Sequence, residues 1–329
     1  MLIQLHSEAP PAEVRRQLQA LGLWTRDLKD AEGRVGSMSI QAGSAPVSIE
    51  VLRALPGVAD VHAPASPHPL VDHARGRPVT LGTTSLNDGP PILIAGPCSI
   101  ESEAMIHDLA SVAATAGATF VRGGAYKPRT SPHQFSGHGE VALTWIREAA
   151  DAVGLQVVTE VLSENTVEAV ARCADMLQIG SRNMQNFALL HAVGRTGIPV
   201  LLKRANGASI EEWLLAGEHL LHAGTGTVVF CERGIRGFDP HTRNLLDMGA
   251  IAVLRHEFGL PVIADPSHGS GRRDLVVPLA LSAVAAGAHG VMVEISRDPS
   301  TALSDGPQAI LPETLQALSE GLQITEQTP

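Results

Sequence analysis

The sequence predicts a (β/α)₈ barrel preceded by a small ferredoxin-like α+β domain. From about residue 91 onward, short continuous apolar runs alternate with Ala-rich stretches, and this unit recurs eight times over about 240 residues. Residues 1–63 instead follow the order strand, helix, strand, strand, helix, strand, which is the split-βαβ pattern. The change of rhythm places a domain boundary between the two regions.

The N-terminal elements follow from alternation, helical spacing and turn residues. Val14, Leu18 and Leu21 recur at helical spacing, and Gly22 ends that helix. The turn Asp30–Gly33 joins two strands that we expect to pair. The expected strands are Leu2–Leu5, Leu23–Leu28, Val35–Ile40 and Val58–His62, and the expected helices are Pro11–Leu21 and Val47–Leu55.

Proline-rich residues separate the two regions. We expect residues 1–65 to form the ferredoxin-like domain, residues 66–78 to form a stiff linker, and residues 79–329 to form the barrel. Val79–Leu86, followed by Asn87-Asp88-Gly89, predicts a small hairpin before the first barrel strand.

The barrel strands are expected where apolar residues run without interruption. A doubly wound open sheet is the alternative, but no GxGxxG-type turn follows any of these strands. Helices are expected between them, for example at Ala104–Ala116, Val141–Val153 and Leu275–Ala286. The expected strands are Ile92–Ala95, Thr119–Val121, Gln156–Thr159, Met176–Ile179, Val200–Leu202, Thr227–Phe230, Val262–Ala264 and Gly290–Val293.

Composition narrows the classes of partner. The formal net charge of −10 argues against nucleic acid or an anionic membrane as a partner, so any anion site must be a local cationic cluster. The start lacks the pattern of a signal peptide, and no apolar run is long enough to span a membrane. The three cysteines are scattered and do not form a disulfide pattern. We therefore expect a cytoplasmic protein.

Polar or reactive residues follow every expected barrel strand. One such residue is ordinarily a helix cap or a surface ion pair, but eight in register favour a convergent site. Active sites of barrels are built at the C-terminal ends of the strands. In chain order these residues are Cys98, Arg122 with Lys127, Glu160, Arg182, Lys203, Glu232 with Arg233, Asp265 with His268, and Glu294.

The segment Arg122–Pro132 carries the densest positive charge. It places Arg122, Lys127 and Arg129 beside the hydroxyls of Thr130 and Ser131 on a stretch that prolines stiffen. Cations held on a stiff loop at a strand end suit a small phosphorylated anion.

The strand-end residues divide into two chemical groups. Six cations exceed the need of one phosphate, so two anionic groups or two phosphorylated substrates are expected; the cations are Arg122, Lys127, Arg129, Arg182, Lys203 and Arg233. One thiolate, one imidazole and two carboxylates suit Mn²⁺, Fe²⁺, Co²⁺ or Zn²⁺ better than Mg²⁺; these residues are Cys98, His268, Glu294 and Asp305.

Several ordered motifs resemble 3-deoxy-7-phosphoheptulonate (DAHP) synthase, in the form related to KDO8P synthase. The resemblance covers residues 80–320 closely, whereas over residues 1–65 it is a match of pattern only. The motifs are Ala95-Gly-Pro-Cys-Ser-Ile-Glu-Ser102, Arg122-Gly-Gly-Ala-Tyr-Lys-Pro-Arg-Thr-Ser131, Gln178-Ile-Gly-Ser-Arg-Asn183, Cys231-Glu-Arg-Gly234, Asp265-Pro-Ser-His268 and Ala302-Leu-Ser-Asp-Gly306.

The resemblance implies condensation of phosphoenolpyruvate with erythrose 4-phosphate, the first step of the shikimate pathway to aromatic amino acids. It implies that Cys98, His268, Glu294 and Asp305 bind a divalent metal ion. Phosphoenolpyruvate would be held by Arg122, Lys127, Arg182, Lys203 and Arg233, and the aldose phosphate by Arg129 and Thr130. Glu232 is also expected among the substrate-binding residues. Catalytic roles would fall to Lys127, Glu160, Cys98 and His268, with Glu160 or a metal-bound water orienting the water that adds.

Ser296-Arg297 departs from the family pattern, where His-Pro is expected, and this affects the conformation expected for the local loop. KDO8P synthase, which takes a five-carbon aldose phosphate, is the near alternative; Lys127-Pro-Arg-Thr-Ser131 favours the four-carbon acceptor. A non-catalytic sugar-phosphate sensor is the alternative from another class.

The N-terminal domain carries no catalytic set of residues, so we expect it to regulate the barrel. By resemblance, the effector would be tyrosine or phenylalanine, bound between domains of neighbouring subunits in a homo-oligomer, expected as a homotetramer. A domain used only for assembly is the alternative.

Overall fold

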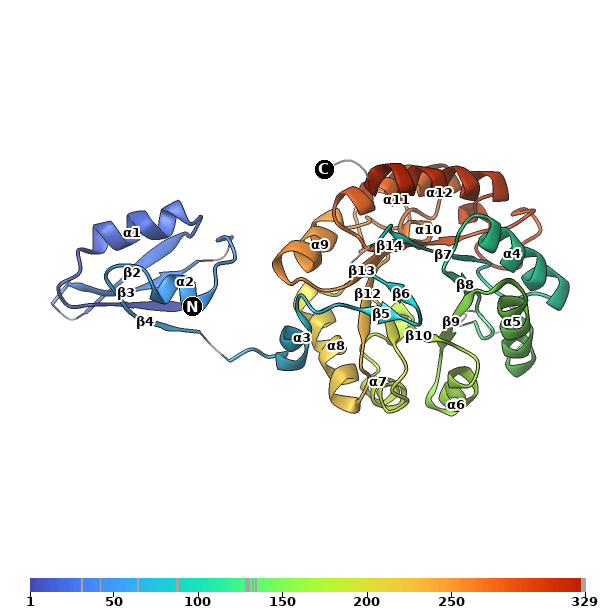
Figure 1. Ribbon diagram of the computed structural model, residues 1–329, viewed down its shortest axis with the longest axis horizontal. Helices are drawn as coiled ribbons and strands as arrows, with labels where there is room; N and C mark the ends of the chain where they lie inside the picture. Colours follow the sequence, from blue (N-terminus) through green and yellow to red (C-terminus); the bar gives the residue numbers. More distant parts are fainter. Residues whose placement is uncertain are drawn as a thin grey trace. The chain divides into compact units, whose positions relative to one another are not determined.

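The structure is a computed structural model that describes residues 1–326, with the backbone alone for 324–326. Not described within that range are Ala31, Ala42, Pro64, Asn87, Asp88, residues 128–130, Pro132 and Gln134. The chain forms two compact units, Met1–Pro67 and His68–Pro329 (Figure 1). Each unit has a hydrophobic core of its own.

The N-terminal unit is a four-stranded sheet with two helices, as the sequence predicts. The strand order is β2-β3-β1-β4, and every recorded pairing is antiparallel. Ile3, Leu18, Met38 and Leu52 are fully buried in its core. The elements are β1 (Leu2–Leu5), α1 (Pro11–Ala20), β2 (Thr25–Lys29), β3 (Val35–Ile40), α2 (Ile49–Arg53) and β4 (Val58–His62).

The second unit is a closed barrel of eight parallel strands, which confirms the predicted fold class. Closure excludes the open doubly wound sheet, since β14 pairs with β7 and completes the ring. The strands are β7 (Ile92–Gly96), β8 (Phe120–Arg122), β9 (Gln156–Val161), β10 (Met176–Ile179), β11 (Val200–Lys203), β12 (Val228–Glu232), β13 (Val262–Ala264) and β14 (Gly290–Glu294).

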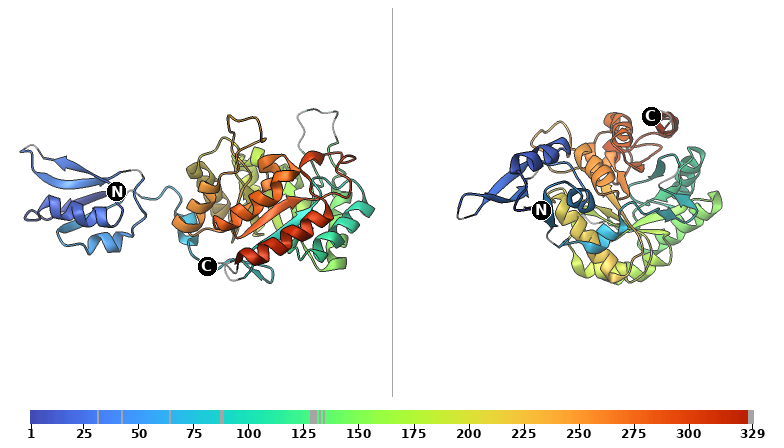
Figure 2. Two further views of the ribbon diagram at one scale, coloured as in Figure 1. Left: turned by 90° about the horizontal axis from the view of Figure 1, so that it is seen from above. Right: turned by 60° about the vertical axis from the view of Figure 1, so that its left-hand side comes forward.

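Helices surround these strands (Figure 1). Their apolar faces bury aliphatic residues against the sheet, and α12 lies beside α11 on the outside of the barrel (Figure 2). The helices are α4 (Glu103–Thr115), α5 (Glu140–Val153), α6 (Val167–Ala171), α7 (Phe187–Gly194), α8 (Ile210–Ala223), α9 (Met248–Ala252), α10 (Pro266–Ser270), α11 (Val276–Ala285) and α12 (Pro312–Glu326).

A short hairpin closes the N-terminal end of the barrel. It consists of β5 (Thr80–Leu81) and β6 (Thr84–Ser85), so its turn lies at Gly82-Thr83 and precedes the Asn87-Asp88-Gly89 turn signal, of which Asn87 and Asp88 lie outside the described residues. Leu81 and Leu86 pack against residues that point into the barrel. The hairpin therefore blocks this end with apolar side chains.

The segment expected as a linker contains helix α3 (Pro69–Ala74). Pro69 occupies the first turn, where a missing N–H costs nothing. The Glu218 carboxylate on α8 accepts hydrogen bonds from the backbone N–H groups of Leu70 and Val71, at 3.0 and 2.9 Å. These contacts fix α3 to the barrel unit.

Within the described residues, no helix has both the length and the apolarity that a membrane crossing requires.

Candidate active site

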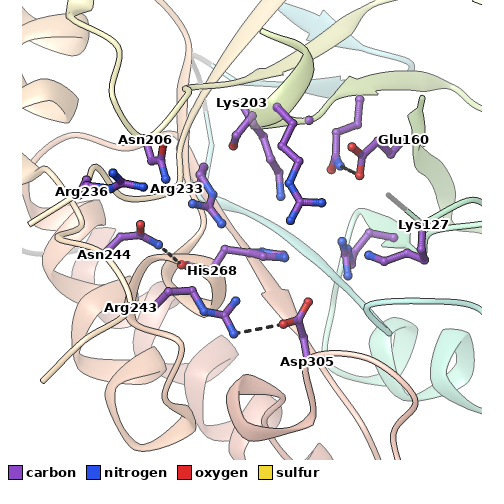
Figure 3. Close-up of a pocket in the computed structure, with 15 residues that line it drawn as sticks. Lys127, Glu160, Lys203, Asn206, Arg233, Arg236, Arg243, Asn244, His268 and Asp305 are labelled. Carbon is purple, nitrogen blue, oxygen red and sulfur yellow. Dashed lines mark hydrogen bonds and ion pairs between the residues drawn. The ribbon is translucent and has the colours of Figure 1, made fainter. Parts of the chain in front are cut away.

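The C-terminal ends of the strands surround a cavity of about 550 Å³ (Figure 3). Because the opposite end of the barrel is filled by the hairpin, this is where polar residues from different strands can converge. The described lining residues are Arg122, Lys127, Glu160, Gln178, Gly180, Ser181, Arg182, Lys203, Asn206, Arg233, Arg236, Arg243, Asn244, His268 and Asp305.

The cavity is strongly cationic although the whole chain is acidic. Its described lining includes seven Arg or Lys side chains and two carboxylates, whereas the chain carries a formal net charge of −10. Arg236, Arg243 and Asn244 lie on one side, and Lys127 and Glu160 lie on the other (Figure 3). The charge of such a cavity suits phosphorylated anions.

Four side chains at one edge of the cavity can hold a metal ion. One ligand atom from each of Cys98, His268, Glu294 and Asp305 lies within 4.8 Å of the other three. They come from the loop after β7, from α10, from the end of β14 and from the loop after β14. A thiol, an imidazole and two carboxylates together suit Mn²⁺, Fe²⁺, Co²⁺ or Zn²⁺.

Neighbouring acceptors orient the His268 ring. Its Nδ1 lies 2.7 Å from Asp265 Oδ2, and its Nε2 lies 3.3 Å from Glu294 Oε1. A proton on Nδ1 that is donated to Asp265 leaves Nε2 as the ligand atom within the cluster, the usual arrangement of a metal-binding histidine.

Cys98 contacts both a cation and a carboxylate. Its Sγ lies 3.1 Å from Lys127 Nζ and donates to Asp305 Oδ2 at 3.2 Å. Burial, followed by the charge of Glu294, raises the pKa of the Cys98 thiol to about 12. Without a cation the thiol therefore stays protonated, and ligation requires loss of that proton.

The two carboxylates of the cluster stay ionised. Burial raises the pKa of Glu294, but His268 and Arg122, whose Nη1 donates to Oε1 at 2.9 Å, outweigh it and lower that pKa below its ordinary value. Burial also raises the pKa of Asp305, and the charge of His268 followed by the hydrogen bond from Cys98 brings it down to about 2.

Asp305 is the only non-glycine residue with positive φ in the part of the chain that is described, at 48°. Adjacent contacts hold it there, because the backbone N–H of Leu303 donates to Glu101 Oε1 at 2.8 Å and the Ser304 and Ser99 hydroxyls lie 2.6 Å apart. The loops that carry Cys98 and Asp305 are thus joined directly.

Glu160 lies on the far side of the cavity in a tightly fitted position. Gln178 Nε2 donates to its Oε2 at 3.3 Å. A Cβ on Gly180 would lie 1.9 Å from its Oε1, so this glycine makes room for the carboxylate. Glu160 can therefore present an oxygen to a bound molecule from a fixed position.

The structure brings most of the predicted residues together. Arg122, Lys127, Glu160, Arg182, Lys203 and Arg233 line the cavity, and Cys98 and Glu294 join His268 and Asp305 in the cluster. Glu232 does not line the cavity: its buried carboxylate accepts from Arg204 Nη1 at 3.0 Å and from the backbone N–H of Gly234 at 2.6 Å. Arg129 and Thr130 lie outside the described residues.

Sequence reasoning missed the residues that longer loops contribute. Arg236 and Arg243 belong to the loop after β12, whose ends are joined by two 2.9 Å backbone hydrogen bonds between Ile235 and Leu245. This loop returns its basic residues to the cavity, and Asn206, Asn244 and Gln178 complete the polar lining. The sequence did contain a signal for them, because Arg236 and Arg243 follow a strand that already ends in Glu232-Arg233-Gly234.

Comparison with known proteins decides the family. Residues 77–328 match the model of the DAHP synthetase I family. The chain belongs to this family. It is 48% identical over 238 residues to a phospho-2-dehydro-3-deoxyheptonate aldolase of Thermotoga maritima, covering 72% of this chain and 70% of the relative. The resemblance to DAHP synthase is confirmed, and the protein is an enzyme.

Solved structures agree with this assignment. The crystal structure of a DAHP synthase from Thermotoga maritima matches with a TM-score of 0.77 at 39% identity, covering 98% of this chain and 96% of that one. A truncated form of 3-deoxy-D-arabino-heptulosonate 7-phosphate synthase from the same organism matches with a TM-score of 0.71 at 43% identity, over 77% of this chain and 92% of that one.

A second group of relatives bears a different name. A 2-dehydro-3-deoxyphosphooctonate aldolase of Alkalilimnicola ehrlichii is 33% identical over 264 residues, covering 73% of this chain and 92% of the relative.

Proposed function

We propose that the protein condenses phosphoenolpyruvate with erythrose 4-phosphate in a metal-dependent reaction. The products are 3-deoxy-D-arabino-heptulosonate 7-phosphate and inorganic phosphate, the first step of the shikimate pathway. The observation that carries the proposal is the strongly cationic cavity beside a cluster with one thiol, one imidazole and two carboxylates.

The residues of the cluster fit a divalent cation. Their ligand atoms lie close together, both carboxylates are ionised, and Nε2 of His268 is directed into the cluster. When bound by Cys98, His268, Glu294 and Asp305, the cation would supply a Lewis acid that polarises the aldehyde oxygen of the aldose.

The basic residues would bind and orient the two anions. Arg122, Lys127, Arg182, Lys203 and Arg233 would hold phosphoenolpyruvate with its methylene carbon facing the aldehyde. Arg129 and Thr130 would hold the aldose phosphate. Attack by that carbon would form the new carbon–carbon bond and leave positive charge at C2, to which water then adds.

Glu160 is our candidate for orienting that water. Its carboxylate lines the cavity, and both Gln178 and the narrow space beside Gly180 fix its position. The basic residues would then assist departure of the phosphate.

Phosphate release measured with each aldose phosphate tests the proposal. We expect rapid release with erythrose 4-phosphate, loss after treatment with a strong chelator, and recovery with Mn²⁺. Full turnover by metal-stripped protein would contradict metal dependence. Equal or faster turnover of arabinose 5-phosphate would favour the KDO8P synthase activity.

We also propose that the N-terminal unit regulates the barrel. It has its own core, and residues 77–328 account for the family match without it. Its effector would be tyrosine or phenylalanine, bound in a homotetramer. Deletion of residues 1–67 should leave an active enzyme that neither amino acid inhibits, while the full chain is inhibited. Inhibition that survives deletion would place the effector site on the barrel.

A further inference from the structure

Asp265 follows strand β13 and lies between the cation cluster and the basic side chains of the cavity. It is fully buried, and it does not line the cavity itself. Its Oδ1 caps α10 by accepting the backbone N–H of His268 at 3.0 Å. The other oxygen, Oδ2, is therefore the atom that can accept hydrogen bonds from other side chains.

Two donors that belong to different parts of the site share Oδ2. Lys203 Nζ lies 2.5 Å from Oδ2, and His268 Nδ1 lies 2.7 Å from the same atom. Lys203 lines the cavity among the residues assigned to phosphoenolpyruvate, while His268 belongs to the cation cluster. All three side chains are largely or fully buried, with exposed fractions of 5%, 15% and 0% for Lys203, His268 and Asp265.

We propose that Asp265 is a positioning residue that couples the cation site to the phosphoenolpyruvate site. The inference rests on the proposed function. A buried carboxylate oxygen that is shared between two donors cannot move toward one without weakening its bond to the other. A ligand that shifts His268 therefore changes the strength of the hydrogen bond from Lys203 to Asp265. An anion that draws Lys203 into the cavity likewise changes the hydrogen bond from His268 to Asp265.

The direction of the coupling is favourable for both ligands. A cation bound at Nε2 withdraws electron density from the imidazole and strengthens the hydrogen bond from Nδ1–H to Asp265. Oδ2 then binds Lys203 less strongly, and the ammonium group becomes more available to an anion in the cavity. By thermodynamic reciprocity, phosphoenolpyruvate must raise the affinity for the cation by the same factor.

The chain offers a closely matched pair of variants. Asp265→Asn keeps the oxygen that caps α10 and replaces the shared acceptor with an amide. Asp247→Asn makes the same change at the cap of α9, where Oδ1 accepts the Ala250 N–H at 2.9 Å and Oδ2 pairs with Arg204 at 3.0 Å. Asp247 contacts neither His268 nor Lys203, so it controls for loss of a capping carboxylate.

The test measures binding in the full-length protein. Affinities for Mn²⁺ and for phosphoenolpyruvate are determined by calorimetry, each with and without the other, after correction for Mn²⁺ bound by free phosphoenolpyruvate. In the wild type, we expect each ligand to strengthen the other about tenfold, within the usual range of coupling. Asp265→Asn should weaken Mn²⁺ binding about 10- to 100-fold, as loss of a partner to a ligand histidine does.

The decisive readout is the coupling factor. It should fall at least threefold in Asp265→Asn and stay within twofold of wild type in Asp247→Asn. A coupling factor in Asp265→Asn equal to that of wild type would overturn the inference, because attraction across space would then explain all of it. Wild-type protein that binds neither ligand would overturn the proposed function instead.

A second variant keeps the inference testable if Asp265→Asn does not fold. Lys203→Gln removes the donor on the phosphoenolpyruvate side and leaves all four cluster residues in place. In the absence of phosphoenolpyruvate, it should change the affinity for Mn²⁺ by at least threefold, because Oδ2 of Asp265 then no longer accepts a hydrogen bond from Lys203 and is shared with no donor other than His268. An unchanged affinity would overturn the coupling.

Discussion

The two ends of the barrel are built from the same strands, yet one supplies stability and the other supplies chemistry. At the hairpin end, inward-pointing side chains are apolar and pack around Leu81 and Leu86. At the other end, inward-pointing side chains are charged or polar and line the cavity or the cation cluster. Residues two apart on a strand share a face, so each strand can serve both layers.

The pairs of residues make this division explicit. On six strands, an apolar residue of the inner core is followed two positions later by a residue of the site: Phe120 and Arg122, Val158 and Glu160, Met176 and Gln178, Leu201 and Lys203, Cys231 and Arg233, and Met292 and Glu294. On β7 the second position is Gly96, where a Cβ would lie 1.9 Å from the Arg122 carbonyl oxygen. The apolar layer and the polar layer of the barrel interior are therefore separated by about 7 Å along each strand.

The largest difference in enzyme activity should be between variants of two histidines, one at each end of the barrel. His268→Ala removes a cluster ligand, so we expect no measurable turnover even with excess Mn²⁺, together with weakened Mn²⁺ binding. His289→Ala, beside the start of β14, should keep kcat/KM within threefold of wild type. Steady-state assays and Mn²⁺ titration of both variants check this, and turnover by His268→Ala would contradict it.

The next largest difference in kcat should be between alanine variants of two glycines, one at each end of the barrel. Gly180→Ala has no room beside Glu160, our candidate for orienting the water. If Glu160 has that role, displacing it by about 1 Å should cost roughly a hundredfold in kcat. Gly226→Ala, toward the hairpin end, meets no atom within 4 Å and should stay within twofold of wild type. Comparable kcat values in the two variants would remove Glu160 from the reaction.

The hairpin should show the reverse pattern. Leu81→Ala removes a side chain with 1% exposure from the apolar plug and should lower the free energy of unfolding by about 2 to 4 kcal/mol. Its kcat/KM at 25 °C should remain within threefold of wild type. Val141→Ala, at a position with 47% exposure, serves as the control and should change stability by less than about 0.5 kcal/mol. Urea unfolding and activity assays separate the two effects.

The smallest effect concerns pH. Burial, followed by the charge of Arg255, lowers the pKa of His289 from 6.5 to about 4. Between those values the unfolded chain binds a proton that the folded protein does not bind, so stability falls as pH decreases through this window. The contribution of one group is at most about 1.4 kcal/mol per pH unit. Urea unfolding at pH 7, 6 and 5 should therefore show a shallower pH dependence in His289→Gln; an identical dependence would contradict this assignment.

The barrel was readable from sequence because its strands are continuous apolar runs. Predicted ends differ from observed ends by at most two residues, and both ends agree for Met176–Ile179 and Val262–Ala264. The observed strands often continue into the first polar residue, as at Lys203, Glu232 and Glu294. The ladder is made by backbone groups, so it does not stop where the apolar side chains stop. Helix α3 has no counterpart in the prediction, because the proline-rich residues 63–69 predict a stiff linker, although the last of these prolines, Pro69, begins the helix.

The candidate site was readable only where it lies next to a strand. Lys203 and Glu160 could be found from position alone, whereas Arg236 and Arg243 reach the cavity through a loop held by hydrogen bonds between Ile235 and Leu245. That pairing depends on tertiary structure and has no local sequence signal. The contacts that Asp265 makes with both Lys203 and His268 were likewise hidden, since they depend on the relative positions of β11 and β13, which are separated by β12 in the barrel.

The backbone at Asp305 has an evolutionary consequence. A non-glycine residue at a φ of 48° carries strain of about 1 kcal/mol or more, which glycine would relieve. Selection for folding alone would therefore favour glycine at this position. The backbone at Asp305 and its carboxylate thus have opposing preferences, because the carboxylate belongs to the cluster that can hold a cation.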